Sequence, residues 1–458
     1  MSVLYLYKSF FIKKIESLMK AKAFFRKIGC FICTKEIFED SNSSKLLYKY
    51  FLTGFLIRLI FLPFFFQRDV LSTYQRAAQT VFAGNLAADF QQFVMHLLHS
   101  AYLFVIKFLI PDVSQFAKIM LTESTWTSWI DFNNFSYVYR TLALFKFPYL
   151  ILDIACMFLI LRLLYDGEPE KKLRIFKYWV LNPLVIFVTY IFARHDIVAV
   201  FFILISLILA KNNRKYWSIF ILAVGIIMRF FPIMILPFLI VFLARRKKDY
   251  AILFSIGIAG LILLEAFSYV YFGRSVIFSL LNTQHFDYIL SAKLNLIIHD
   301  AVFIFIVAYM ILLFSFIHQK NKTFELFLNY CGIVYLLYVA TSYFHPQYLL
   351  YAIPFLVLIF TRRNSIYYYH LIQFGFLMFV LIYWGDLVTK FLFAPIDVKY
   401  VLYLPGPIPV INRFYDPVKF VNIFRSVFSA VSIWMIYLIY RINKSINFDL
   451  QVNKSDKS

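Results

Sequence analysis

The sequence predicts an all-α, polytopic membrane protein, because its residues are more apolar and less charged than those of a water-soluble domain. Of 458 residues, 62% are hydrophobic and 15% are charged, whereas soluble domains average about 45–50% and about 25%. Apolar runs near the roughly 20 residues that span a bilayer follow one another along almost the whole chain. We therefore expect one helical bundle, and a water-soluble enzyme is excluded.

Basic residues set the expected orientation of this bundle. The chain carries 46 Lys and Arg against 24 Asp and Glu, a formal charge of +22. These basic residues concentrate in short loops between apolar runs, as in loops that face the cytoplasm and its anionic lipids. The pattern predicts that both termini are cytoplasmic, and it argues against nucleic acid as a partner.

Three parts of the chain are predicted. Residues 1–45 form a cytoplasmic, basic, amphipathic segment, residues 46–442 form the transmembrane domain, and residues 443–458 form a cytoplasmic polar tail. The N-terminal part contains Cys30 and Cys33, but neither a second pair nor a nearby histidine accompanies this CxxC. Reduced thiols are therefore favoured over zinc or redox chemistry.

The first two apolar runs define a large outer loop. The run 47–66 leads outward from the basic N-terminus, and the run 141–165 ends before a basic, inner loop. Residues 67–140 are therefore expected outside. Their apolar stretch 93–110 carries two histidines and a lysine, so we interpret it as re-entrant or interfacial, with a further span as the alternative.

Ten further apolar runs alternate regularly and bring the expected total to about 12 spans. They cover residues 178–192, 197–210, 216–228, 231–243, 251–272, 298–317, 323–343, 348–360, 365–384 and 426–440.

Polar residues gather at the predicted outer ends of these spans. Such residues are costly in a membrane and tend to face a cavity or a partner, so their convergence predicts an outward-facing polar cavity. They are Asp69, Arg194, His195, Asp196, Arg229, His285, Asp287, His345 and Gln347.

Asp69 is the candidate catalytic residue. It follows the first span directly, and a carboxylate at the mouth of an apolar cavity can have its pKa adjusted for proton abstraction from a hydroxyl. The alternative is a structural role, as a helix N-cap or as the partner of Arg68.

Arg229 and His345 are candidates for binding a phosphate. Arg229 has no acidic neighbour in the sequence, and an unpaired guanidinium can grip a phosphate with two parallel hydrogen bonds. Alternatively, it anchors the chain to lipid headgroups. His345 and Gln347, in Phe-His-Pro-Gln-Tyr, could hold a phosphate or a sugar hydroxyl, or could belong to a simple turn.

The other candidates for substrate binding carry weaker signals. Arg194, His195 and Asp196 are most simply a solvated turn with a local ion pair, and a metal pair of His195 with Asp196 is a weaker alternative. His285 belongs to an outer loop that could cover a cavity, although a structural role is favoured. Ionisable residues within or near the apolar runs are expected to be structural polar groups: Lys146, Asp153 and Glu265.

Several short motifs, in order along residues 47–361, resemble those of polytopic GT-C glycosyltransferases. The match is nearest to the mannosyltransferases of the GPI-anchor first-mannose type and of the bacterial polyprenyl-phosphate-mannose-dependent type. The motifs are Arg58 in the first span, Asp69, the group Tyr74, Ala77, Ala78 and Gly84, Phe-Lys-Phe-Pro-Tyr-Leu-Ile-Leu-Asp at 145–153, Trp-Val-Leu-Asn-Pro at 179–183, Arg-Phe-Phe-Pro at 229–232 and Phe-His-Pro-Gln-Tyr at 344–348.

This resemblance implies a GT-C-like fold and an inverting glycosyltransferase. It would move a sugar, mannose by the resemblance, from a polyprenyl or dolichyl phosphate carrier to a lipid-linked, glycan or protein acceptor on the outer face. The role of general base carries over to Asp69 and phosphate contact to Arg229. A polysaccharide polymerase or ligase and a transporter or flippase of lipid-linked sugar are the alternatives.

The sequence departs from the family at the position of a second acidic residue, since Val70, Leu71 and Ser72 follow Asp69. We therefore expect no metal and no other cofactor, with a divalent cation left open. The prokaryotic plasma membrane is favoured over the endoplasmic reticulum.

Overall fold

A computed structural model describes residues 41–89, 91–110, 113–116, 132–133, 137–163, 168–282, 284–297 and 300–455. The predicted N-terminal segment lies outside the described residues up to residue 40, as do Cys30 and Cys33. The described chain is almost entirely helical, which confirms the all-α prediction, with one two-stranded antiparallel hairpin as the exception.

The first half of the described chain forms a run of helices with one cross-lying helix near its start. The elements are α3 Ser41–Phe64, α4 Arg68–Ala83, η1 Leu86–Asp89, α5 Phe93–Ile106, η2 Lys107–Leu109, α6 Val113–Phe116, α8 Val138–Leu163, α9 Pro169–Val180, α10 Pro183–Ile186, the π-helical η3 Phe187–Ile191, α11 Ile197–Lys211, α12 Lys215–Met228, η4 Phe231–Ile235 and α13 Leu236–Leu243.

The second half adds the hairpin and returns through long helices. Its elements are α14 Lys247–Phe272, α15 Val276–Leu281, α16 Gln284–Ile289, β1 Lys293–Ile297, β2 Asp300–Phe303, α17 Ile304–Ile317, α18 Phe324–Thr341, η5 Pro346–Ala352, α19 Ile353–Phe360, α20 Asn364–Val380, η6 Leu381–Val388, η7 Lys390–Phe393, α21 Val398–Tyr403, α22 Pro407–Ile411 and α23 Pro417–Ser455.

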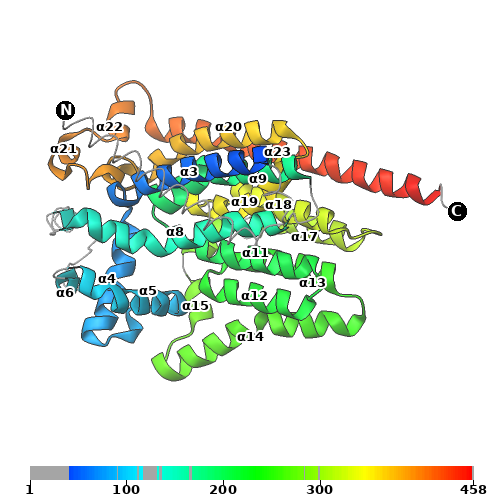
Figure 1. Cartoon of the computed structure of the whole chain (residues 1–458), viewed down its shortest axis with the longest axis horizontal. Helices are drawn as coiled ribbons and strands as arrows, with labels where there is room; N and C mark the ends of the chain where they lie inside the picture. The colour runs from blue at the N-terminus through cyan, green and yellow to red at the C-terminus, as the bar shows by residue number, and fades with distance from the viewer. Residues whose placement is uncertain are drawn as a thin grey trace.

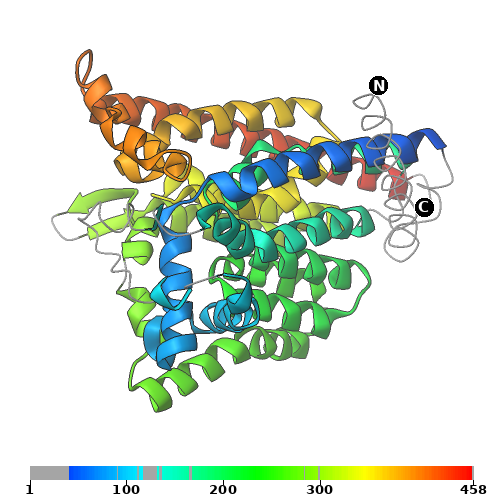
Figure 2. The ribbon, with the colours of Figure 1, turned by 60° about the vertical axis from the view of Figure 1, so that its left-hand side comes forward.

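Seven helical segments of the described chain are long and apolar enough to cross a membrane. They coincide with seven of the predicted spans, and the other predicted spans coincide with shorter apolar helices of 10–17 residues. The long helices lie side by side in one bundle (Figure 1). Figure 2 shows α3 beginning and α23 ending on the same side of the molecule. The number of spans and the cytoplasmic side remain predictions.

One predicted span is wrong in its first part. The apolar run 298–317 was expected to be helical from its start, but Asp300–Phe303 pairs with Lys293–Ile297 as a hairpin and the helix begins only at Ile304. Hydropathy predicted a span here because Ala301, Val302 and Phe303 are apolar. However, Val302 is β-branched and Phe303 is aromatic, and residues of these types also favour strands.

Helix α4 lies across the ends of the long helices (Figure 2). The Gln67 side chain caps its start by accepting the Asp69 amide at 2.6 Å, and Gly84, with φ +70°, ends it in the left-handed region that suits glycine. Its apolar face is buried, and Tyr74 stacks on Phe145 of α8 at 3.8 Å and donates to the Phe145 carbonyl at 2.6 Å. These contacts fix α4, and with it Asp69, against the bundle.

A buried polar network ties α3, α8 and α9 together. The Arg58 Nε donates to Asp153 Oδ2 at 2.6 Å, and both side chains are fully buried. Asp153 also accepts from Trp179 Nε1 at 2.8 Å and from the Tyr190 hydroxyl at 2.9 Å. Arg58 further donates to the carbonyl of Val180 at 2.6 Å. Asp153 is therefore a structural polar group, as expected from the sequence.

Lys146 and Glu265 are likewise held by backbone groups. The buried Lys146 ammonium donates to the carbonyls of Phe65 at 2.6 Å and Tyr190 at 2.9 Å. Carbonyls at helix C-termini lack intrahelical donors, so a cation here satisfies them. Glu265 Oε2 accepts the Ile277 amide at 2.9 Å and so joins α14 to α15.

Candidate active site

Asp69 lies in the first turn of α4, where its side chain is 44% exposed. The next residues along the helix, Val70 and Leu71, face the core. The carboxylate therefore lies at the edge of the packed bundle, with its backbone fixed by the Gln67 cap and one side open.

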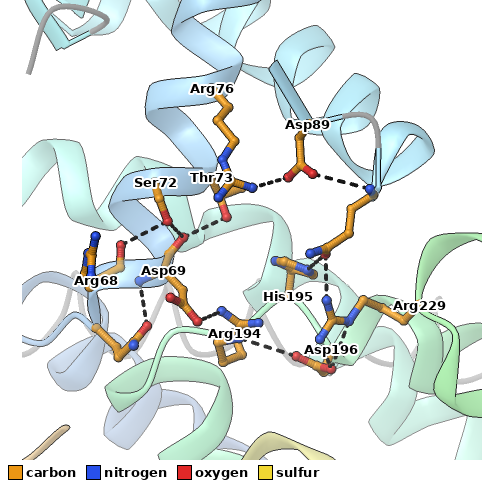
Figure 3. A network of polar contacts seen from close by, with 12 residues as sticks. Arg68, Asp69, Ser72, Thr73, Arg76, Asp89, Arg194, His195, Asp196 and Arg229 are labelled. Carbon is orange, nitrogen blue, oxygen red and sulfur yellow. Dashed lines mark hydrogen bonds and ion pairs between the residues drawn. The ribbon is translucent and has the colours of Figure 1, made fainter. Parts of the chain in front are cut away.

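Arg194 forms an ion pair with this carboxylate (Figure 3). It lies in the short turn between η3 and α11, where Ala193 adopts a positive φ of 56°. The Arg194 side chain is only 9% exposed. Its Nε lies 3.7 Å from Asp196 Oδ2, so one guanidinium stands between two carboxylates.

Asp196 is fully buried and forms the next link. Its Oδ1 accepts from Arg229 Nε at 3.1 Å and from the Tyr351 hydroxyl at 2.7 Å. Arg229 in turn donates from its NH1 group to Gln92 Oε1 at 2.6 Å. Figure 3 shows the resulting row, in which Asp69, Arg194, Asp196 and Arg229 alternate in charge. We call these four residues the charge row.

The charge row keeps Asp69 ionised. Burial raises the pKa of the Asp69 carboxyl, but Arg194, His345, the Gln67 contact and Arg76 together outweigh it and hold the pKa below its ordinary value. Two carboxylates and two guanidinium groups compensate one another in the row, so its buried members need no outside ion. The Asp69 carboxyl is thus half-exposed and ionised at neutral pH.

The prediction that Arg229 is unpaired is wrong. The guanidinium is 9% exposed and is held by Asp196 and Gln92. Its partners lie 33 and 137 positions away in the chain, so the absence of an acidic neighbour in the sequence said nothing about its surroundings. Arg229 is built into the charge row, and both the headgroup anchor and the open phosphate grip fit it poorly.

The prediction of a solvated turn at residues 194–196 is also wrong. Arg194, His195 and Asp196 are 8%, 5% and 0% exposed. The expected local ion pair is present as the 3.7 Å contact of Arg194 with Asp196, but the main partners of this turn come from α4, from the C-terminal end of α12 and from η5. In a membrane protein, helices that are distant in the sequence can bury a polar turn between two apolar runs. This is the case for the turn at residues 194–196.

His195 is a neutral imidazole between Gln92 and His99. Its Nε2 lies 3.3 Å from Gln92 Oε1, and the rings of His195 and His99 are 5.3 Å apart. Burial first, then Arg229 and Arg194, hold the pKa of His195 well below its ordinary value. A neutral ring next to two guanidinium groups adds no further positive charge to the site.

His345 and Gln347 approach the site from the other half of the chain. His345 is half-buried and contributes electrostatically to the lowered pKa of the Asp69 carboxyl. Gln347 is 2% exposed, and its Oε1 has no hydrogen-bond partner among the described residues. The helix α16 contains His285 and Asp287; the His285 side chain lies outside what the structure describes, and Asp287 is exposed. The structure thus joins four candidates in the charge row, with His195 and His345 beside it.

Sequence reasoning missed several residues of the site. Gln92 and Tyr351 bind members of the charge row, and Arg76 forms an ion pair with Asp89 above it (Figure 3). Gln92 stands directly before the apolar run 93–110, and the hydropathy of that run gives no indication that the preceding residue belongs to a site. Tyr351 is one of 33 tyrosines, and no sequence signal separates it from the others.

In the described part of the chain, no three His, Cys, Asp or Glu side chains come together as a metal site would require. Comparison with known proteins yields no match: neither a protein-family model, nor a curated protein, nor a solved structure is similar to the chain.

Proposed function

We propose that this chain is an inverting glycosyltransferase. It would move a sugar, mannose by the resemblance of its motifs, from a polyprenyl or dolichyl phosphate to a glycan, lipid or protein acceptor outside the cytoplasm, with the prokaryotic plasma membrane as its site. The observation that carries the proposal is Asp69, an ionised and half-exposed carboxylate at the edge of an all-helical membrane bundle.

The proposed reaction needs one proton acceptor. The Asp69 carboxylate takes the proton of the acceptor hydroxyl as its oxygen attacks the anomeric carbon of the sugar. The bond between this carbon and the phosphate oxygen breaks with its electron pair passing to the phosphate, and the lipid phosphate leaves. A single displacement inverts the anomeric centre.

The charge row supplies orientation rather than phosphate binding in this proposal. Arg194 holds Asp69 in place, while Asp196 and Arg229 fix Arg194 from behind. Preorganised charges of this kind need no rearrangement during the reaction. The neutral charge row would not compete with the leaving phosphate for a counter-ion. This assignment replaces the expected phosphate contact of Arg229.

The proposal accounts for a half-exposed, ionised Asp69, which a transporter would not require. Transport of a polyprenyl-phosphate sugar breaks no glycosyl bond and would leave this carboxylate without a proton to accept, whereas a polymerase would also deprotonate an acceptor hydroxyl. No observation favours either alternative specifically.

The test compares membranes that contain wild type, Asp69→Asn or Asp416→Asn at matched levels, given radiolabelled polyprenyl-phosphate mannose and EDTA. Asp416 is an exposed aspartate that caps α23 through the Lys419 amide at 2.8 Å, and asparagine caps equally well. We expect label transfer by wild type and Asp416→Asn and a loss of at least about 100-fold in Asp69→Asn. Equal transfer by all three proteins would refute the role of Asp69.

A further inference from the structure

Five aromatic rings cluster beside the charge row. Tyr343 lies 4.4 Å from Tyr288 and 5.5 Å from Tyr383, measured between ring centroids. Trp384 lies 5.6 Å from Tyr343 and stacks on His345 at 5.5 Å with an interplanar angle of 29°. We call Tyr288, Tyr343, His345, Tyr383 and Trp384 the aromatic cluster.

Three separate parts of the chain build this cluster. Tyr288 comes from α16, Tyr343 and His345 from the segment between α18 and η5, and Tyr383 and Trp384 from η6. The Tyr343 amide donates to the Tyr288 carbonyl at 3.2 Å and so pins the first part to the second. Because these parts are far apart in the sequence, their convergence requires the complete fold.

The cluster is incompletely covered. Tyr383 is 54% exposed, and the other four side chains are half-buried. Its members also carry polar edges, namely three phenol hydroxyls, an indole N–H and an imidazole. This surface therefore combines apolar ring faces with hydrogen-bonding edges.

A continuous path of side chains connects the cluster to Asp69. His345 lies 5.9 Å from Tyr348, and Tyr348 stacks on Phe231 at 3.8 Å. Phe231 stacks on Tyr351 at 5.5 Å, and Tyr351 donates to Asp196 of the charge row. Arg194 then links Asp196 to Asp69. The aromatic cluster is therefore continuous with the candidate active site.

We infer that the aromatic cluster is a binding site for a sugar ring of the acceptor, an inference that rests on the proposed function. A pyranose ring has an apolar C–H face and a rim of hydroxyls. The C–H face packs against aromatic rings, whose faces carry partial negative charge, and the hydroxyls exchange hydrogen bonds with phenol, indole and imidazole groups. We assign this sugar to the acceptor, whose hydroxyl must reach Asp69, and the donor KM tests the opposite assignment.

Tyrosine and tryptophan are also enriched where membrane proteins meet the lipid headgroups. The experiment therefore has to separate binding of a sugar from anchoring at the headgroups. It compares wild type with Trp384→Ala, Trp384→Phe and Trp217→Ala. Trp217 in α12 is 62% exposed and stands at the opposite end of its helix from Arg229, so it is the control for a tryptophan that lies away from the site.

The first measurement is transfer from polyprenyl-phosphate mannose at saturating donor, with the concentration of a short mannose oligosaccharide varied. We expect the acceptor KM to rise about tenfold in Trp384→Ala and much less in Trp384→Phe, with kcat and the donor KM within about twofold of wild type. Trp217→Ala should equal wild type. An unchanged acceptor KM in Trp384→Ala refutes the inference, and a rise in the donor KM alone assigns the sugar to the donor and refutes it as well.

The second measurement keeps the inference separate from the proposed function. The same oligosaccharide is titrated without donor into purified wild type and Trp384→Phe while tryptophan fluorescence is recorded. A saturable change in wild type that is absent in Trp384→Phe supports the sugar site even if no transfer is found. Identical responses of the two proteins overturn it even if transfer occurs.

Discussion

Removing the buried charge of Asp153 should destabilise the protein strongly. In Asp153→Asn the side chain keeps its shape but no longer neutralises Arg58, whose guanidinium is fully buried and otherwise donates to the carbonyls of Gly54 and Val180. Breaking one half of a buried ion pair costs about 3–5 kcal/mol, a large share of the roughly 5–15 kcal/mol of a typical domain.

The expected loss translates into a measurable change of Tm. With an unfolding entropy of about 2.1 cal/mol/K per residue over 458 residues, a loss of about 3–5 kcal/mol lowers the Tm by about 3–5 °C. The assay is thermal unfolding in detergent, followed by fluorescence-detected size exclusion.

Two further variants make this prediction decisive. Glu325→Gln breaks the part-exposed ion pair with Arg362 and should change stability by only about 0–1 kcal/mol. The double variant Arg58→Met/Asp153→Asn removes both buried charges while an amide oxygen still accepts from Trp179 and Tyr190, so it should be more stable than Asp153→Asn. If Asp153→Asn unfolds with wild-type Tm, or if the double variant is the least stable, the assigned role of the pair is incorrect.

Three other predictions concern the site and the packing around it. Arg194 is the largest of the groups that lower the pKa of Asp69, so in Arg194→Met this pKa should rise and the acid limb of kcat/KM should move to higher pH than in wild type; an unmoved limb would count against the ion pair. In wild type that ion pair stabilises the fold at neutral pH, and its contribution is lost only as the pH falls through the depressed pKa of Asp69. A Cβ in Gly54→Ala would overlap the Val180 side chain and approach the Val180 carbonyl to 3.0 Å, so the variant should lose about 1–3 kcal/mol in thermal unfolding, and wild-type stability would contradict this packing. EDTA should leave label transfer unchanged, whereas loss restored by Mg²⁺ or Mn²⁺ would disprove metal independence.

Hydropathy predicted where most helices lie, because the cost of exposing backbone polar groups to lipid forces apolar runs into helices. It failed at residues 300–303, where a short apolar sequence forms a strand instead. In such a short run the pattern of apolar residues fits a strand as well as a helix.

The sequence also placed the polar candidates together at one end of the spans, but it could not pair them. Asp69 and Arg194 are 125 positions apart, and Arg229 and Gln92 are 137 apart. Local charge patterns carry no information about such contacts, which is why Arg229 was expected to be unpaired. Several motif residues that carried the resemblance, among them Arg58, Asp153 and Trp179, instead hold helices together.

We propose that the chain transfers a sugar by a single displacement for which Asp69 is the base. The most direct measurement is the anomeric configuration of the product made by purified wild type from β-linked polyprenyl-phosphate mannose, determined by NMR after EDTA treatment. The account predicts an α-linked product and stoichiometric release of lipid phosphate. A β-linked product, or sugar–lipid that is moved across the bilayer with its phosphate bond intact, would contradict it.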